Sequence, residues 1–268
     1  MIDLKLIDVE FSFDGMQEVP PDDEMLHAGL KYLPDSFYIP RSEWDDRIRE
    51  HEKNKSSADY FSGRYTHQGN SHECVCHSAQ QLFMTAYNRQ FNGLQHDVWF
   101  SPLALYTRIT GGKRWGGSNV RDSCEEMIAR GMLPCHDGPA GDNAQTKIFD
   151  HTLHQTSGRT ESHWPTSGWV TPRQLPDGWE NTAKQFRALE VYLIPRDVEA
   201  HASVLLHGMA LSNGRQGHSI PHVKLVKENG RYLSQYKDSY NVMRYDSERW
   251  MDSGGFCIRS VTTPDIKE

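Results

Sequence analysis

The amino-acid sequence predicts an α+β protein with two lobes, one mainly helical and the other mainly antiparallel β. Two helix patterns occupy the first half of the 268-residue chain, whereas strand patterns joined by a hairpin signal dominate its last third. Helices followed by strands, rather than alternating with them, are typical of the α+β class. Hydrophobic residues make up 37% of the chain and charged residues 24%, which is typical of a globular protein with a sizeable core.

Residues 1–40 are interpreted as an N-terminal extension. Their segment LKLIDVEF alternates in the manner of a strand, and EVPPDDE then breaks the pattern. We expect the extension to pack on the β lobe as an added strand; the alternative is that it lies across the space between the two lobes and inhibits the protein. From residue 41 to about 63 the chain is polar, and EHEKNKSSAD is interpreted as a solvated loop or a helix end.

Two helices are predicted from apolar spacing and end signals. The first covers residues 75–86, where apolar side chains recur at i, i+4, i+7, i+8 and i+11, and Asn92-Gly93 follows as its end. The second runs from about Asn119 to Arg130 and is closed by Gly131. Four of its side chains are expected to face the core: Val120, Cys124, Met127 and Ile128.

Residues 138–187 carry little periodic signal, and their tryptophans (Trp164, Trp169 and Trp179) are interpreted as packing under loops rather than contacting substrate. The chain then turns to strand patterns. LEVYLIP at 189–195 is a predicted strand, and GGFCIRSVT is the last one. Between them, Asn229-Gly230 separates HSIPHVKLV from RYLSQYKDS, which is a strong hairpin signal.

Composition excludes some classes of function. A formal net charge of −7 gives no basic face for a nucleic-acid partner. The N-terminus lacks the features of a signal peptide, and no apolar run approaches the ~20 residues that would span a membrane. Five cysteines form too sparse and odd a set for a secreted disulfide framework. We therefore expect a cytoplasmic protein with free thiols and no membrane partner.

The stretch THQGNSHECVCHSAQQLF, residues 66–83, concentrates reactive side chains. His72, Cys74, Cys76 and His77 have the ligand types that zinc prefers. They lie too close together to converge on one tetrahedral ion, however, and the chain has no distant second Cys pair of the usual spacing. We therefore predict no metal and no cofactor.

The alternative for this stretch is a nucleophile at a helix start. Cys74 lies at the first turn, where unpaired backbone N–H groups and the helix dipole favour a thiolate, the attacking form of cysteine. Cys76 points to another face and is interpreted as packing. A base and an orienting group are available at the predicted hairpin, where His218 begins one strand and Asp238 ends the next.

These segments resemble the papain-like cysteine peptidases, in the family's order. QGNSHECVCHSA resembles the segment around the catalytic cysteine, which places Gln68 on the oxyanion glutamine and Cys74 on the nucleophile. GHSIPHV resembles the segment of the catalytic histidine, His218, and YKDSYN that of its orienting asparagine, here Asp238. WGGSN resembles the Gly-Gly loop that binds the substrate backbone, and WMDSGGFCIRS resembles the closing strand.

The resemblance implies a papain-like two-lobe fold with an active-site cleft between a helical lobe and an antiparallel β-barrel lobe. It divides the chain into the extension 1–40, a helical lobe with the nucleophile at 41–140 and a barrel lobe at 141–268. It implies cleavage of a peptide or protein substrate, bound with the help of three residues: Gly116, Gly117 and Ser219. The resemblance is to a divergent member of the signal-less kind that is found in bacteria and phages.

Several positions depart from the family pattern, namely His72, Glu73, Val75, Asp238 and Tyr240. The carboxylate of Glu73 opposes thiolate formation unless it points to solvent. These departures favour a second hypothesis, a structural or interaction protein with weak or lost catalysis, such as a phage virion component with assembly partners. A third hypothesis keeps Cys, His and Asp but changes the chemistry, as in a cell-wall amidase or a transglutaminase-like acyl transferase.

Overall fold

The computed structural model describes the chain over these segments: 30–61, 73–91, 99–111, 117–136, 149–150, 175–215, 218–237, 243–247 and 254–262. The segment LKLIDVEF and the tryptophans Trp164 and Trp169 lie outside them. The helices are η1 (Asp35–Phe37), η2 (Arg41–Glu43), α2 (Trp44–Lys53), α3 (Ser57–Tyr60), α4 (Cys74–Gln90), α5 (Pro102–Thr110), α6 (Val120–Ala129), α7 (Trp179–Ala183) and α8 (Val198–Leu206). No described helix has both the length and the apolar character that a membrane crossing requires.

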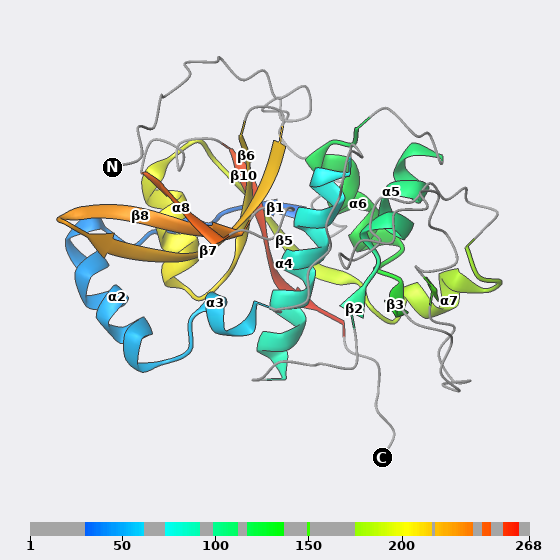
Figure 1. The fold of residues 1–268 in the computed structure, drawn as a ribbon, viewed down its shortest axis with the longest axis horizontal. Helices are drawn as coiled ribbons and strands as arrows, with labels where there is room; N and C mark the ends of the chain where they lie inside the picture. Colours follow the sequence, from blue (N-terminus) through cyan, green and yellow to red (C-terminus); the bar gives the residue numbers. More distant parts are fainter. Residues whose placement is uncertain are drawn as a thin grey trace.

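Seven strands form one mostly antiparallel sheet in the order β1-β5-β10-β6-β7-β8-β9. They are β1 (Leu30–Tyr32), β5 (Ala188–Ile194), β6 (Leu211–Arg215), β7 (His218–Glu228), β8 (Arg231–Lys237), β9 (Met243–Ser247) and β10 (Gly255–Val261). A smaller sheet joins β2 (Trp99–Phe100), β3 (Pro134–His136) and β4 (Phe149–Asp150). The protein therefore has the predicted α+β, two-lobe fold, with α5 and α6 on one side of α4 and the large sheet on the other (Figure 1).

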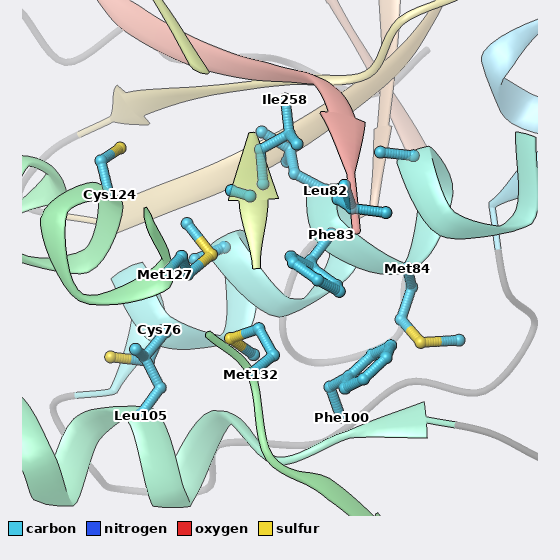
Figure 2. Close-up of a cluster of buried hydrophobic side chains, with 14 of the residues drawn as sticks. Cys76, Leu82, Phe83, Met84, Phe100, Leu105, Cys124, Met127, Met132 and Ile258 are labelled. Carbon is cyan, nitrogen blue, oxygen red and sulfur yellow. The ribbon is translucent and has the colours of Figure 1, made fainter. Parts of the chain in front are cut away.

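Helix α4 is the element on which the two lobes meet. Almost every side chain from Val75 to Asn88 is buried, which is typical of a helix enclosed on all sides rather than on one face. Its apolar side chains join one core cluster with α5, α6 and the near face of the sheet (Figure 2). Phe83 packs edge-on against Phe100 with 4.8 Å between the ring centroids. Helix α4 is therefore anchored in the main core by side chains along most of its length.

A second core cluster lies on the opposite face of the sheet, where α2 and α8 cover β7 and its neighbours. Trp44 of α2 is fully buried there and donates its indole N–H to the carbonyl of Ile39 at 2.9 Å. The sheet is thus a central layer between α4 on one side and α2 and α8 on the other (Figure 1).

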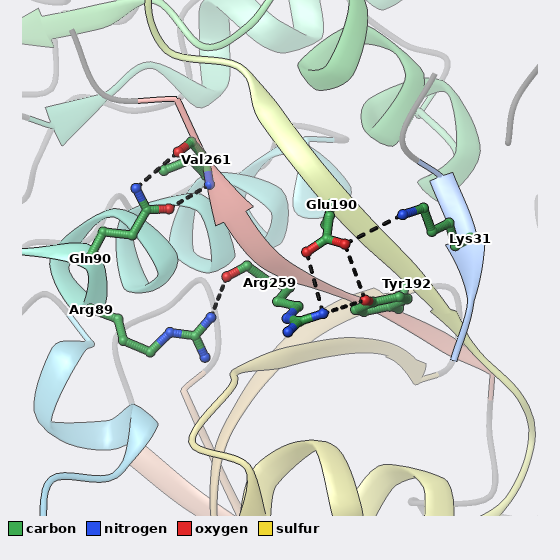
Figure 3. Close-up of polar contacts among 7 residues, drawn as sticks. All are labelled: Lys31, Arg89, Gln90, Glu190, Tyr192, Arg259 and Val261. Carbon is green, nitrogen blue, oxygen red and sulfur yellow. Dashed lines mark hydrogen bonds and ion pairs between the residues drawn. The ribbon is translucent and has the colours of Figure 1, made fainter. Parts of the chain in front are cut away.

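Polar contacts fix the edge of the sheet where the N-terminal segment enters (Figure 3). Leu30 is buried in β1, which pairs in parallel with β5, and Lys31 lies 3.4 Å from Glu190. Glu190 also lies 3.5 Å from Arg259 of β10, and Arg259 donates to the hydroxyl of Tyr192 at 3.0 Å. The end of the extension at residues 30–32 is therefore an added strand.

The elements predicted from end signals are confirmed. Asn119 caps α6 by accepting from the N–H of Asp122 at 2.7 Å, and Gly131 follows with the left-handed φ of 85°. The four predicted core side chains of α6 are all buried. Asn229 and Gly230 have φ values of 50° and 77°, the pair of positive values that a tight hairpin turn needs.

Several of the described helices were not predicted, among them α2, α5 and α8. Helix α2 begins before the stretch EHEKNKSSAD and ends within it, so the interpretation as a helix end fits, but the start of the helix was not predicted. The helix buries Trp44 and Ile48 one turn apart. Helix α5 has clear local signals in hindsight: Ser101 caps it, accepting from Ala104 N–H at 2.8 Å, and a proline occupies the first turn. Trp179 is partly buried against the main core, with the Arg108 guanidinium 4.9 Å from its ring, in agreement with a packing role.

Candidate active site

Cys74 is the first residue of α4, and its side chain is partly buried. Burial raises the pKa of its thiol above the ordinary value. Backbone N–H groups of Ser219, Val75 and Cys74 itself act against burial and lower that pKa, because they donate to the sulfur. A smaller contribution comes from the charge of Glu73, which raises the pKa. The predicted amide donors are present, but burial outweighs them, so the pKa of the Cys74 thiol is raised rather than lowered as the helix start predicted.

His218 is the first residue of β7 and is partly buried. The residue after it, Ser219, is buried, and its hydroxyl lies 2.7 Å from the hydroxyl of Ser212 on β6. Since the backbone N–H of Ser219 reaches the Cys74 sulfur, the start of β7 and the start of α4 lie side by side. The tertiary structure thus places the start of β7, which carries His218 and Ser219, beside the start of α4, which carries Cys74.

Three of the predicted site residues, Gln68, Asp238 and Gly116, lie outside the described residues. Strand β8 ends at Lys237, immediately before Asp238. Gly117 is described and has a φ of 62°, with no atom within 4 Å of the position that a Cβ would take. The left-handed φ of Gly117, rather than a lack of space for a side chain, therefore favours glycine at this position.

Glu73 does not point to solvent. It is 2% exposed, and its carboxylate lies 3.5 Å from the Nε2 atom of His77, one helical turn further along α4. Glu73 occupies the N-cap position of α4, yet its side chain makes no capping hydrogen bond there. The departure that the sequence analysis singled out is thus a buried charged group beside the candidate nucleophile.

The two cysteines of the motif have different surroundings. Cys76 is fully buried, with its sulfur 3.5 Å from the hydroxyl of Ser118, and burial raises its pKa to about 12. It is a packing residue, as predicted from the helix face on which it lies. Burial also raises the pKa values of Cys124 and Cys257, the latter to about 12. Among the cysteines whose side chains are described, Cys74 is therefore the most accessible thiol and the one best placed to react.

Tyr106 belongs to this region and was not predicted. It comes from α5, and burial, together with the nearby charge of Glu73, raises its pKa to about 12. Tyr106 was not a candidate site residue because the helix that carries it, α5, was not predicted from the sequence. Within the described part of the chain, no group of three or more His, Cys, Asp or Glu side chains is arranged to hold a metal ion.

Solved structures of cysteine proteases share this fold. Xylellain, a cysteine protease from Xylella fastidiosa, matches with a TM-score of 0.54 and 13% identity, over 87% of this chain and 96% of that one. Procathepsin B S9 from Trypanosoma congolense matches with a TM-score of 0.51 and 11% identity, over 89% and 85%. The proform of the ragweed pollen allergen Amb a 11 matches with a TM-score of 0.51 and 11% identity, over 76% and 63%.

No family model and no curated protein matches the sequence. The likeness therefore lies in the arrangement of helices and strands, at sequence identities far below those at which function can be carried over. The chain has the fold of papain-like cysteine proteases.

Proposed function

We propose that the protein is a cysteine peptidase with Cys74 as its nucleophile. The observation that carries this proposal is the position of Cys74, a partly buried thiol at the first turn of α4 whose sulfur faces the N–H of Ser219 at the start of β7. This contact supports His218, the neighbour of Ser219, as the proton donor and acceptor. A thiol and an imidazole from two lobes are the pair that nucleophilic acyl transfer requires.

In the proposed reaction the Cys74 thiolate attacks the carbonyl carbon of a peptide bond, and His218 protonates the leaving amine. His218 then activates a water molecule, which hydrolyses the thioester and releases the enzyme. The carboxamide of Gln68 and the backbone N–H of Cys74 donate to the oxyanion, and each such donor contributes a few kcal/mol of transition-state stabilisation. Asp238 orients the imidazole of His218.

Substrate binding is assigned to three further residues, Gly116, Gly117 and Ser219. The open space beside Gly117 supports contact with an extended substrate backbone. The hydroxyl of Ser219 points toward Ser212. Ser219 would therefore line a substrate pocket with its backbone and Cβ rather than with its hydroxyl.

The proposal is tested with Cys74→Ser, and Cys76→Ser is the matched control two residues away. Cleavage of an unstructured protein such as denatured casein should fall at least about 10³-fold in Cys74→Ser, because a serine hydroxyl is a much weaker nucleophile than a thiolate. Cys76→Ser should keep its activity, since that side chain is buried beside Ser118. Undiminished cleavage by Cys74→Ser would show that the assignment is wrong.

A second candidate is a papain-like structural or interaction protein with weak catalysis. The buried charge of Glu73 favours it, because this charge adds to the burial that already raises the pKa of Cys74. The rate at which iodoacetamide alkylates Cys74 near neutral pH separates the two candidates. A rate well above that of an ordinary exposed thiol supports the peptidase, whereas an equal or lower rate supports the structural protein.

A further inference from the structure

The second histidine of the segment GHSIPHV, His222, ties strand β7 to both of its neighbours in the sheet. His222 is 1% exposed, and its Nε2 lies 2.7 Å from Oδ1 of Asn213 on β6. Its Nδ1 lies 2.5 Å from the hydroxyl of Ser234 on β8. The amide oxygen accepts from Nε2, whereas a hydroxyl either donates to Nδ1 or accepts from it, so both hydrogen bonds hold whether or not the ring is charged.

Both hydrogen bonds run diagonally across the sheet. In the backbone pairing, Asn213 lies opposite Ile220, two residues before His222. Ser234 lies opposite Leu225, three residues after His222. A slip of β7 by one residue would turn its side chains to the other face of the sheet and break both bonds. The imidazole of His222 therefore fixes the register of β7 against β6 and against β8.

This tie lies where the pairing of β7 with β8 is irregular. The register shifts between His222 and Lys224, and irregularities of this kind change the direction in which the neighbouring side chains point. On the side of the shift that leads to the candidate site, His222 pairs with Tyr236, and the two ring centroids lie 5.5 Å apart. The regular ladder beyond Lys224 does not by itself determine where the start of β7 lies, so the side-chain tie at His222 has that task.

The start of β7 is the part of the strand that faces Cys74. Ser219 comes three residues before His222, and its backbone N–H lowers the pKa of the Cys74 thiol. The hydroxyl of Ser219 contacts Ser212, which holds this residue to β6, whereas the His222 ring holds β7 to both β6 and β8. His218 precedes Ser219 at the same strand start. A displacement of the strand would therefore move the amide donor and the candidate imidazole together.

We propose that His222 is a positioning residue, which acts through the register of β7 to hold His218 and the N–H of Ser219 beside Cys74. The part of this inference that concerns His218 rests on the proposed peptidase function. The part that concerns the N–H of Ser219 does not, because it refers only to the surroundings of the Cys74 sulfur.

The test is the pH profile of Cys74 alkylation by iodoacetamide, followed by mass spectrometry of the peptide that contains Cys74. His222→Phe keeps an aromatic ring but removes both hydrogen bonds, so the start of β7 should move away from the sulfur. Alkylation near pH ~7.5 should slow by about fivefold and the profile should move to higher pH, because the thiolate loses an N–H donor. Ser234→Ala removes one of the two bonds and should slow alkylation by about twofold to threefold.

Ile194→Ala is the control for a general loss of stability. Ile194 is 1% exposed in the second core cluster, and β10 and β6 lie between its strand, β5, and β7. The melting temperature of this variant should fall. Its alkylation rate should stay within about 1.5-fold of the wild type, because distant sites act independently.

Two results would overturn the inference. One is an unchanged alkylation profile in His222→Phe and Ser234→Ala although their melting temperatures fall, because the tie would then serve stability alone. The other is an equal slowing in Ile194→Ala, because any loosening of the sheet would then suffice. Should His222→Phe not fold, the profile of Ser234→Ala decides between the inference and a purely stabilising role.

Peptide cleavage separates this inference from the proposed function. Alkylation requires no cleavage, so a protein that cleaves no peptide yet shows slower alkylation in His222→Phe refutes the peptidase and leaves the positioning role standing. A protein whose cleavage depends on Cys74 but whose alkylation is unchanged in His222→Phe supports the peptidase and overturns the positioning role. If both hold, His222→Phe should lower kcat more than it raises KM, because the displaced groups act on the reacting atoms.

Discussion

The backbone N–H of Ser219 donates to the sulfur of Cys74, and this contact joins the first residue of α4 to the second residue of β7. A backbone N–H donor is present in every residue except proline, so a substitution of Ser219 by any other residue keeps it. The helix start supplies two more donors, the N–H groups of Cys74 and Val75. The backbone groups that lower the pKa of the Cys74 thiol therefore come from both α4 and β7.

Ser219→Ala tests whether the amide or the hydroxyl matters. The variant keeps the N–H that reaches Cys74 but loses the hydroxyl contact with Ser212. We expect Cys74 alkylation to stay within about twofold of the wild type, while the free energy of unfolding falls by about 1 kcal/mol for the lost hydrogen bond. A large change in alkylation with unchanged stability would mean that the Ser219 hydroxyl acts on the sulfur itself.

Leu30→Ala tests the role of the N-terminal segment. Leu30 is 1% exposed in β1, so truncation should lower the free energy of unfolding by about 2–5 kcal/mol in denaturant titrations. Its neighbour Lys31 is exposed, and Lys31→Ala should cost less than about 1 kcal/mol although it removes the contact with Glu190. If peptide cleavage by Leu30→Ala rises instead, the segment acts as an inhibitor rather than as an edge strand.

Gly131→Ala tests the junction between α6 and α7. Gly131 has a φ of 85°, and an added Cβ would lie 2.0 Å from the backbone oxygen of Ala183, so strain and a clash combine. Gly111 has a φ of 65° with open space around it, and Gly111→Ala carries only the backbone cost of about 1 kcal/mol. The melting temperature of Gly131→Ala should therefore fall much further. Equal falls for the two variants would show that the backbone near Ala183 moves aside without cost.

Acid should destabilise the fold through His207. Burial lowers the pKa of His207 below its usual value of 6.5, while its Nε2 contacts the carbonyl oxygen of Phe37 at 2.9 Å. The unfolded chain then binds more protons than the folded one below about pH 6.5, so stability is complete above that pH and declines as the pH falls. His207→Gln should flatten this decline in thermal melts taken between about pH 5 and pH 7.5. An unchanged slope would mean that other groups, such as His51, carry the dependence.

The sequence located the elements that have their own local signals. The apolar spacing from Val75 to Ala86 predicted α4, the cap and glycine at Asn119 and Gly131 predicted α6, and Asn229-Gly230 predicted the hairpin. These signals act over a few residues, so no knowledge of the fold was needed. Helix α2 was missed because its polar residues outnumber the two side chains, Trp44 and Ile48, that fix it in the core.

The candidate site was predictable in its residue types but not in its surroundings. The position of Cys74 at a helix start follows from the sequence, and so does the strand that begins at His218. The sequence could not show that Glu73 is buried or that it faces His77, because burial depends on which elements cover the first turn of α4. Tyr106 approaches that turn only because α5 packs across α4.

The sequence by itself determined the class of fold and the reactive residue types, since periodicity, caps and turn residues are local properties of the chain. Tertiary structure alone decided which backbone amide of β7 faces the sulfur of Cys74. It also decided that a carboxylate beside Cys74 is buried against a histidine. The physical reason is that pKa values and reactivity depend on burial and on neighbouring charges, which packing between distant segments creates.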